Sequence, residues 1–177
     1  MLRPLTMEHA TEDYVGWLND PKTNRYLETR FRPQSLSTLR AFIERQIENP
    51  TVAFFAIHDG DNGRFLGSVK LSDIKEQHRS GVVGYFVGDQ ESWGRGIGTN
   101  AVGALCTFSM RQVGLKKIRA SCYSGNLGSI RVLQKIGFTQ EGRQRYQVEG
   151  PCGREDILDF GLTEHELNFE NFPAIIE

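Results

Sequence analysis

Cysteine is scarce in this sequence. Its 177 residues include three cysteines, Cys106, Cys122 and Cys152, and no two of them form a Cys-x-x-Cys pair. An odd number of isolated cysteines gives neither a zinc framework nor a disulfide scaffold, and it fits a reducing compartment. The four histidines are also scattered, without the spacing of metal ligands. We therefore expect a cytoplasmic protein that needs no metal.

Long apolar stretches and an excess of charge of either sign are missing as well. No run of roughly 18 apolar residues occurs, so no membrane-spanning helix is expected. The first ten residues, MLRPLTMEHA, lack the apolar core of a signal peptide. The 21 Lys and Arg nearly balance the 22 Asp and Glu, which leaves a net charge of -1. This balance argues against nucleic acid or a membrane surface as a partner.

What is present is an ordinary globular composition. Hydrophobic residues make up 38% and charged residues 24%, the balance of a folded domain rather than of a disordered chain. No internal repeat or Pro/Gly-rich linker divides the sequence. We therefore predict one domain over residues 1–177, with a core at about 2–163 and a C-terminal tail at 164–177. The apolar residues of the tail are expected to dock on this domain or on a partner.

The spacing of the apolar residues predicts an α+β fold. Alternating or continuous apolar runs bounded by turn residues indicate strands, and apolar residues three and four apart indicate helices. The predicted order is β-α-α-β-β-β-α-β-α-β-β. Strands are expected at 2–6, 51–59, 65–74, 81–88, 116–123 and on both sides of a turn at 149–153, and helices at about 8–18, 35–48, 96–112 and 126–137.

A glycine-rich loop lies between a buried strand and a strongly patterned helix, in the stretch GYFVGDQESWGRGIGTNAVG. Gly94, Gly96 and Gly98 alternate in it. Glycines let the backbone approach a ligand closely and point successive N–H groups at one place. The N-terminus of the helix behind the loop adds unpaired N–H donors and a partial positive charge. These features predict a pyrophosphate site, against the alternative of a plain flexible turn.

Two common phosphate-binding loops do not fit this stretch. A P-loop needs Lys-Ser or Lys-Thr after the glycines, and neither follows here. A dinucleotide-binding fingerprint needs a spacing one residue longer, inside a parallel βαβ unit, whereas the strands before this loop are predicted as hairpins. The loop is therefore a phosphate site of another kind.

Together with a second motif, this loop makes the chain resemble the GCN5-related N-acetyltransferase (GNAT) superfamily. Two motifs in the right order carry the resemblance: GYFVGDQESWGRGIGTNAV and NLGSIRVLQKIGFTQEGRQR. The N-terminal LRPLTMEHATEDYVGWLND and the closing GREDILDFGL resemble the branch that acetylates ribosomal proteins. The resemblance covers about residues 2–163 and implies an N-acetyltransferase with acetyl-CoA as co-substrate. It also implies a mostly antiparallel mixed sheet with a splayed central strand, flanked by about four helices.

The same resemblance implies where the coenzyme binds. A bulge would free the backbone of Phe86, Val87 and Gly88 to pair with the pantetheine amides, and the N–H of Val87 would hold the thioester oxygen. Asn126 would bond the pantetheine arm, with Ser129 beside it. The pyrophosphate loop would consist of Trp93, Gly94, Arg95, Gly96, Ile97, Gly98 and Thr99, in which Arg95, Gly96, Gly98 and Thr99 donate N–H groups and Trp93 alternatively packs the loop on the domain.

The catalytic groups follow from the resemblance less directly. Many members carry a tyrosine in the helix of the second motif that protonates the departing thiolate, and here Leu133 occupies that position. Ser129 is the substitute donor in the ribosomal-protein branch. The acceptor amine arrives as an ammonium and must lose a proton, so a carboxylate at the channel mouth would help as a base. Glu149 loosely matches the base of that branch, and Glu28 and Asp89 are alternatives.

The acceptor is left open by the sequence. The segment Asn24–Phe31 occupies the region that walls the acceptor pocket in the superfamily, and it mixes arginines and aromatics with Glu28. It could bind a peptide terminus, or a phosphate or sugar through its arginines, or it could be a linker tied to the core. The acceptor is then a protein N-terminus or a small amine such as a nucleotide-linked amino sugar. A non-catalytic acyl-CoA-binding regulatory domain is the alternative function, and a monomer and a homodimer are both open.

Overall fold

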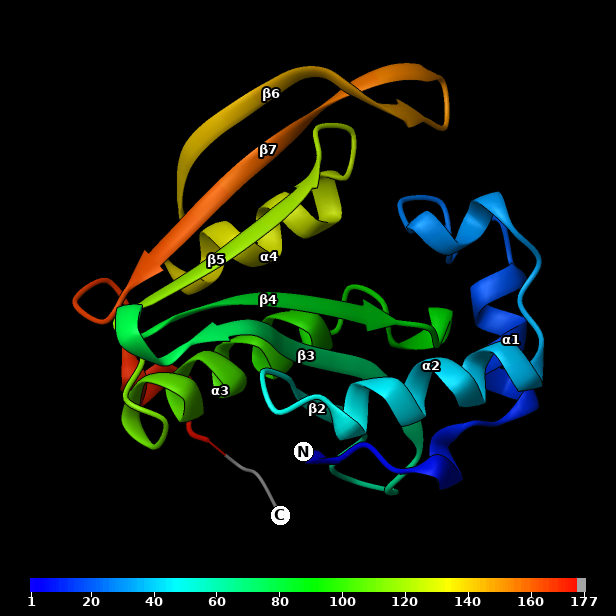
Figure 1. The fold of residues 1–177 in the computed structure, drawn as a ribbon, viewed down its shortest axis with the longest axis horizontal. Coiled ribbons are helices and arrows are strands. Elements are labelled where there is room, and N and C mark those ends of the chain that lie inside the picture. The colour runs from blue at the N-terminus through cyan, green and yellow to red at the C-terminus, as the bar shows by residue number, and fades with distance from the viewer. Residues whose placement is uncertain (175–177) are drawn as a thin grey trace.

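The computed structural model describes residues 1–174 and has the predicted α+β architecture (Figure 1). Its centre is a seven-stranded mixed sheet in the order β1-β2-β3-β4-β5-β7-β6. The predicted order of helices and strands is confirmed. The strands are β1 (Leu2–Pro4), β2 (Ala53–His58), β3 (Phe65–Lys75), β4 (Ser80–Val87), β5 (Lys117–Tyr123), β6 (Thr139–Gly150) and β7 (Gly153–Thr163). The α-helices are α1 (Glu12–Asn19), α2 (Leu36–Glu48), α3 (Ile97–Arg111) and α4 (Leu127–Ile136), and the short 3-10 helices are η1 (Met7–His9), η2 (Glu28–Phe31), η3 (Glu76–His78), η4 (Gln90–Ser92) and η5 (Phe169–Asn171).

The two faces of the sheet carry separate hydrophobic clusters because successive strand residues point to opposite sides. In β2, Phe55 and Ile57 pack in the cluster that contains α3 and α4. Ala56, between them, packs in the cluster that contains α1 and α2. The two helices that belong to the sequence motifs, α3 and α4, are thus on one face of the sheet. The N-terminal helices α1 and α2 are on the other.

The central strands diverge, as expected. β4 and β5 form a parallel pair over Ser80–Val82 and Lys117–Arg119, and beyond that point β5 pairs with β7 alone (Figure 1). The second half of β4 therefore has β3 on one edge and no strand on the other. This divergence opens the cleft in which the candidate site lies.

One predicted helix begins later than expected. The helix predicted from residue 8 starts at Glu12, because Thr11 caps it with its side-chain oxygen, which accepts the N–H of Tyr14 at 3.2 Å. Residues Met7–His9 form the separate 3-10 helix η1. The helix predicted at 35–48 is α2, and Ser35 caps it, since its hydroxyl accepts the N–H of Thr38.

The C-terminal tail docks on its own domain as far as residue 174. Leu167 and Phe172 are buried, and the ring of Phe172 lies so close to Gly103 in α3 that a side chain there would overlap it. The last three residues of the predicted tail, 175–177, lie outside the described residues. Within the described chain, none of the helices combines the length and the apolar character needed to cross a bilayer.

Candidate functional site

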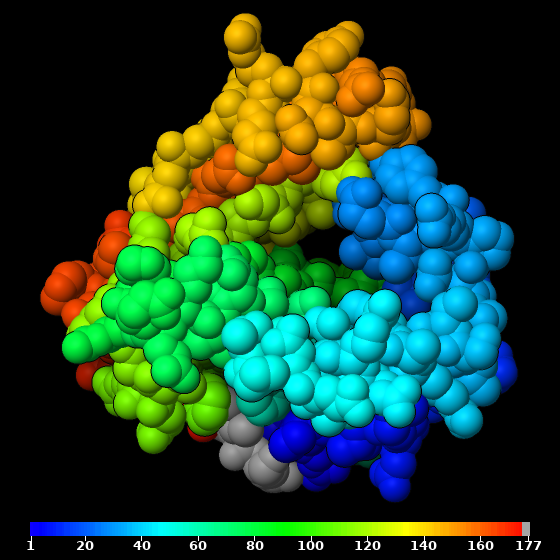
Figure 2. Space-filling model, in the orientation of Figure 1, coloured from blue at the N-terminus to red at the C-terminus, as the bar shows by residue number. Residues whose placement is uncertain are grey.

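The cleft between β4 and β5 forms a cavity of about 600 Å³. Figure 2 shows it opening to the surface between the N-terminal segment and the strands of the sheet. Its walls come from the segment before η2, the end of β4, the glycine-rich loop with the start of α3, and α4. The described residues that line it are Lys22, Thr23, Arg25, Tyr26, Leu27, Tyr85, Phe86, Val87, Ser92, Trp93, Gly94, Gly96, Ile97, Gly98, Thr99, Asn126, Gly128, Ser129, Arg131, Val132 and Lys135.

The glycine-rich loop places a helix N-terminus against this cavity. Gly94 and Gly96 have φ angles of 77° and 82°, in the left-handed region that favours glycine. Gly96 caps α3, and the first helical bond runs from the N–H of Asn100 to the C=O of Gly96 at 2.9 Å. The N–H groups of the residues between these two precede the helical ladder, so they are available to an anion.

The end of β4 contains a bulge, but it leaves fewer free groups than expected. The N–H groups of Gly88 and Asp89 both donate to the C=O of Leu66, at 2.9 and 3.2 Å. A side chain at Gly88 would overlap the ring of Trp17. The N–H of Gly88 is therefore bonded to β3 and not free, in contrast to the freed backbone expected there. Packing against Trp17 explains why position 88 is a glycine.

Val87 is the residue whose backbone faces the cleft. Hydrogen-bonded and non-hydrogen-bonded pairs alternate along an antiparallel ladder. Because Gly88 bonds across to β3, the backbone of Phe86 also points to β3, and that of Val87 points the other way, where β5 has departed. The backbone of Phe86 is thus paired with Ser68 and not free as expected, although Phe86 is among the residues that line the cavity.

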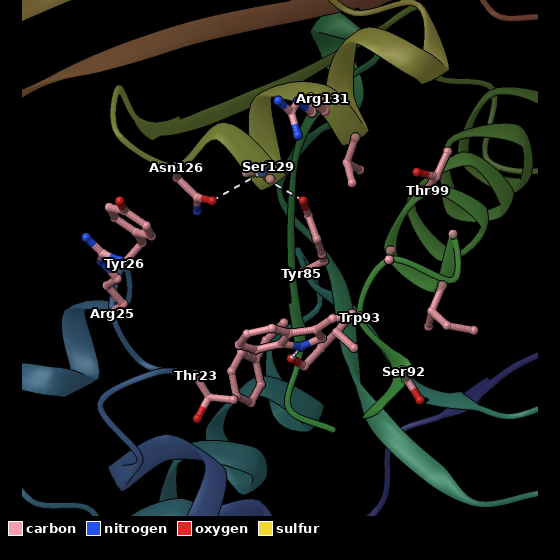
Figure 3. Close-up of a pocket in the computed structure, with 18 of the residues that line it drawn as sticks. Thr23, Arg25, Tyr26, Tyr85, Ser92, Trp93, Thr99, Asn126, Ser129 and Arg131 are labelled. Carbon is pink, nitrogen blue, oxygen red and sulfur yellow. Dashed lines mark hydrogen bonds between the residues drawn. The ribbon is translucent and has the colours of Figure 1, made fainter. Parts of the chain in front are cut away.

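Trp93 fixes the glycine-rich loop to this strand end. Its indole N–H donates to the C=O of Val87 at 2.8 Å, and its ring, 46% exposed, lies on the cavity wall (Figure 3). The N–H of Val87 is left directed at the cleft. Arg95 turns away instead: its guanidinium lies 3.8 Å from the carboxylate of Asp59, and its N–H donates to the C=O of Ser92 at 3.4 Å. The expected N–H contribution of Arg95 to an anion site is not met.

Across the cleft, α4 presents Asn126 and Ser129. Asn126 caps the helix, since its side-chain oxygen accepts the N–H of Ser129 at 3.1 Å. The hydroxyl of Ser129 in turn accepts from the hydroxyl of Tyr85 at 3.2 Å (Figure 3). Burial raises the pKa of Tyr85 to about 12, so this phenol stays a proton donor at neutral pH. Leu133 is 1% exposed and belongs to the core.

Tyr85 is a site residue that the sequence reasoning missed. It lies in a strand that was recognised by its apolar run, and its ring rests on the start of α3, where a side chain at Gly98 would lie 3.1 Å from it. The only signal for it in the sequence is that successive strand residues point to opposite faces of the sheet. This puts Tyr85 on the same face of β4 as the buried Val83. Its contact with Ser129 joins residues 44 apart and has no local signal.

None of the three candidate base residues is among the described residues that line the cavity. The carboxylate of Glu149, at the tip of the β6–β7 hairpin, pairs with Arg154 at 2.9 Å. Asp89 pairs with Arg64 at 2.9 Å and accepts from Ser92. 

Glu28 follows directly on Leu27, which lines the cavity. It accepts a hydrogen bond from the hydroxyl of Tyr123, at the end of β5. Burial, and then this bond, raises the pKa of Tyr123 to about 12. The bond therefore keeps the Glu28 carboxylate at the end of β5, beyond its last pairing with β4 at Arg119.

The segment predicted as the acceptor wall bridges the open end of the cleft. The hydroxyl of Tyr26 donates to the C=O of Gly125 at 2.8 Å. Arg30 donates to the C=O of Arg25 at 2.5 Å and to the C=O of Glu149. Arg30 thus has a structural role, whereas Arg25 lines the cavity.

Potential metal ligands do not gather anywhere in the part of the chain that the structure describes. Within residues 1–174 no group of three or more His, Cys, Asp or Glu side chains could hold a metal ion. The pair of His9 and His58, with ring nitrogens 3.2 Å apart, is bonded through its other nitrogens to the backbone at Thr6 and Gly63.

Comparison with known proteins gives one consistent result. A family model described as an acetyltransferase (GNAT) domain matches residues 1–139. The SPbeta prophage-derived uncharacterized N-acetyltransferase YokL of Bacillus subtilis (strain 168) is 27% identical over 152 residues, 84% of each chain.

Two solved structures share the fold. Spermidine N-acetyltransferase from Vibrio cholerae, in complex with CoA and spermine, superposes with a TM-score of 0.82 at 19% identity, over 94% of this chain and 96% of that one. Mycobacterium smegmatis RimJ, in complex with CoA-disulfide, gives a TM-score of 0.80 at 22% identity, over 94% and 83%.

Proposed function

The chain belongs to the acetyltransferase (GNAT) domain family and is an N-acetyltransferase, and we propose that it transfers the acetyl group of acetyl-CoA to a primary amine inside the cavity of about 600 Å³. One observation carries the proposal. The free N–H of Val87 and the N-terminus of α3 open into the same cavity, so one molecule with an anionic end and an acyl end can reach both. Each end then meets N–H donors that have no partner in the strand or the helix.

These donors would hold the coenzyme. Its pyrophosphate would accept the N–H groups of Gly96, Gly98 and Thr99, and its pantetheine arm would run along the unpaired edge of β4 with Asn126 opposite. The N–H of Val87 would bond the thioester oxygen as it gains negative charge, which is a favourable use of a preorganised donor. The bond from Trp93 to the C=O of Val87 supports this placement, because it holds the loop and the strand end together.

The departing thiolate would receive its proton from Ser129. The acceptor nitrogen attacks the thioester carbon, the carbon–sulfur bond breaks, and the sulfur takes the hydroxyl proton of Ser129. Tyr85, which donates to that hydroxyl, would pass its proton to it in the same step and be reprotonated by water in the cavity. The coenzyme thiol should resemble cysteine, with a pKa of about 8.5, so this step needs only modest help.

The acceptor proton would leave to a carboxylate at the mouth of the cleft. Glu149 is the base inferred from the resemblance. Its side chain pairs with Arg154 at the tip of the β6–β7 hairpin, so the bound amine would have to contact this tip. Glu28 is the second candidate, and its bond to Tyr123 keeps it beside the end of β5. If Glu149 is the base, Glu149→Gln loses activity; if Glu28 is the base, Glu28→Gln does.

The acceptor itself belongs to one of two classes, a protein N-terminus or a small amine. The resemblance of both ends of the sequence to the ribosomal-protein branch favours the first, and the likeness to a spermidine acetyltransferase favours the second. The direct test is release of free thiol from acetyl-CoA over a panel of peptides and small amines. We expect amine-dependent release with at least one acceptor. Tight CoA binding without release for any amine would instead support a non-catalytic acyl-CoA-binding domain.

Replacing Gly96 by valine should weaken coenzyme binding about ten-fold or more while the fold persists. The new side chain meets open space, with Asn100 Nδ2 4.0 Å from the added Cβ, so the effect comes from the backbone alone. A φ of 82° costs a β-branched residue about 1–3 kcal/mol, and relief of that strain turns the N–H groups away from the phosphate. Titration with CoA measures the change. Gly60→Val, in a turn with free space and no left-handed φ, is the matched control, and an unchanged affinity of Gly96→Val contradicts the pyrophosphate assignment.

A further inference from the structure

The far end of the main cavity, across from α3 and α4, is positively charged. Lys22 and Arg25, in the segment between α1 and η2, both line it (Figure 3 labels Arg25). None of the residues that line the cavity is an Asp or a Glu, as far as the structure describes them. Both side chains are exposed, and neither forms an ion pair within residues 1–174. Two cations therefore face the space that a coenzyme between α3 and α4 would leave free.

These cations are held on a rigid frame. The buried Thr23 donates to the C=O of Trp17 at 2.7 Å, and the buried Asn24 donates to the C=O of Leu18 at 2.9 Å. The C=O of Arg25 accepts from Arg30 at 2.5 Å. 

The side chain of Arg25 is supported as well. Its guanidinium lies 5.4 Å from the ring centre of Tyr26, whose hydroxyl is fixed to the C=O of Gly125. Because both the backbone and the side chain are already positioned, little conformational entropy is lost when Arg25 binds an anion.

The acidic side chains around this end of the cleft are already bonded elsewhere. Glu28 accepts from the hydroxyl of Tyr123, Glu149 pairs with Arg154, and Glu155 accepts the N–H of Gly125 at 2.8 Å. None of them is paired with Arg25. Lys22 and Arg25 therefore have no carboxylate in direct ion contact within residues 1–174, and their charge can attract a negatively charged group.

A second, smaller cavity lies on the other side of Arg25. It has a volume of about 240 Å³ and shares Arg25 with the main cavity. Its wall is partly apolar, with Pro21, Phe31 and Pro151, and Arg30 adds a further cation. An acceptor whose charged group bonds Arg25 thus has room to extend past it, along an apolar surface.

We propose that the acceptor is a small amine that carries a carboxylate or phosphate group, and that Arg25, assisted by Lys22, binds this group and so determines specificity. The guanidinium matches both anions with two parallel hydrogen bonds. A polyamine would instead bring further positive charge against Lys22 and Arg25 with no described carboxylate on the wall to receive it. This inference rests on the proposed function and names the substrate class of the same site.

The test compares acceptors that differ only in the anion. Values of kcat/KM are measured for ω-aminoalkyl phosphates of two to six carbons and for amino alcohols of the same lengths, and likewise for ω-amino acids and their amides. A charge-assisted hydrogen bond is worth about 1.5–3 kcal/mol, so the best anionic acceptor should exceed its neutral partner by about 10- to 100-fold. The phosphate and carboxylate arms show which anion is preferred. Spermidine should be a poor acceptor.

Variants assign the effect to Arg25. Arg25→Ala should remove the advantage of the anionic acceptors and leave the neutral ones within about two-fold. Arg25→Lys should restore part of it, because a lysine keeps the charge without the fork of two donors. Arg40→Ala, on the exposed face of α2, is the matched control and should change nothing. The proposal is overturned if neutral and anionic partners react equally, if spermidine is preferred, or if a peptide N-terminus reacts faster than every small anionic amine.

A measurement without turnover separates this inference from the proposed function. The CoA-saturated protein is titrated with glycerol phosphate, and with glycerol, while the fluorescence of Trp93 on the cavity wall is followed. Saturable binding of the phosphate that Arg25→Ala weakens about ten-fold or more supports the anion site, even if no amine is acetylated. Equal binding by the wild-type protein and Arg25→Ala contradicts the anion site, even if acetyl transfer is demonstrated.

Discussion

Removing the carboxylate that takes the acceptor proton should lower kcat by about 10²–10⁴-fold at pH 7, the usual contribution of a general base. An amine with a solution pKa of about 9–10 is about 99% protonated or more at that pH, so its deprotonation limits the rate. The loss should shrink as the pH rises toward the pKa of the amine, because solvent then supplies the free amine. Glu149→Gln should show this behaviour if the hairpin carries the base, and Glu28→Gln if the N-terminal segment does.

The design of this experiment separates a base from a structural residue. Glutamine at position 28 can still accept the hydrogen bond of Tyr123, and the pair that Glu149 forms with Arg154 is half exposed, so neither change should greatly alter stability. Coenzyme affinity should stay the same in both variants. Ser129→Ala should cost less than loss of the base, because the thiolate is already a good leaving group. If both glutamine variants keep full activity from pH 7 to about 9, the base lies elsewhere.

Gly67→Ala should abolish measurable coenzyme binding and destabilise the fold. Gly67 in β3 lies opposite Val87, and an added Cβ would overlap the C=O of Phe86 and lie 2.9 Å from the Cα of Val87. Its φ of 154° adds strain for any side chain. Overpacking of this kind costs about 1–3 kcal/mol or more, and here it is relieved only by moving the backbone that faces the cleft. Thermal unfolding measures the first effect and titration with CoA the second.

Gly84→Ala is the matched control for this prediction. Gly84 lies in β4, and a side chain there meets nothing within 4 Å. Its variant should unfold within about 1 °C of the wild-type protein and bind CoA normally, since surface substitutions away from special features change stability little. A Gly67→Ala protein that keeps both its stability and its coenzyme affinity would show that the backbone at Val87 has no part in binding.

Local patterns account for the parts of the site that were predicted. The loop glycines and the helix from Asn126 to Gly137 follow from residues that are close in sequence, and Asn126 and Gly137 cap α4 as expected. The start of α1 was misplaced because the residues before Thr11 fit the same helical spacing, and only the cap at Thr11 ends that pattern.

Groups that depend on distant contacts could not be predicted. Tyr85 reaches the site through its hydrogen bond to Ser129, and Gly67 has no side chain because Phe86 on the neighbouring strand lies against it. Gly88 shows the opposite error: a glycine in the expected motif was assigned to a ligand, whereas Trp17, about 70 positions earlier, explains why it has no side chain. A single sequence gives the residue types at a site more readily than their partners.

The unpaired edge of β4 also links coenzyme supply to the lifetime of the protein. In the free protein, the groups along this edge must be satisfied by water, and the pantetheine arm would take the place of a missing strand. A ligand that binds the folded chain alone raises the free energy of unfolding, by about 2.7 kcal/mol at a concentration 100 times its Kd. A chain in a coenzyme-poor environment would therefore unfold, and be degraded, more often than the same chain in a coenzyme-rich one.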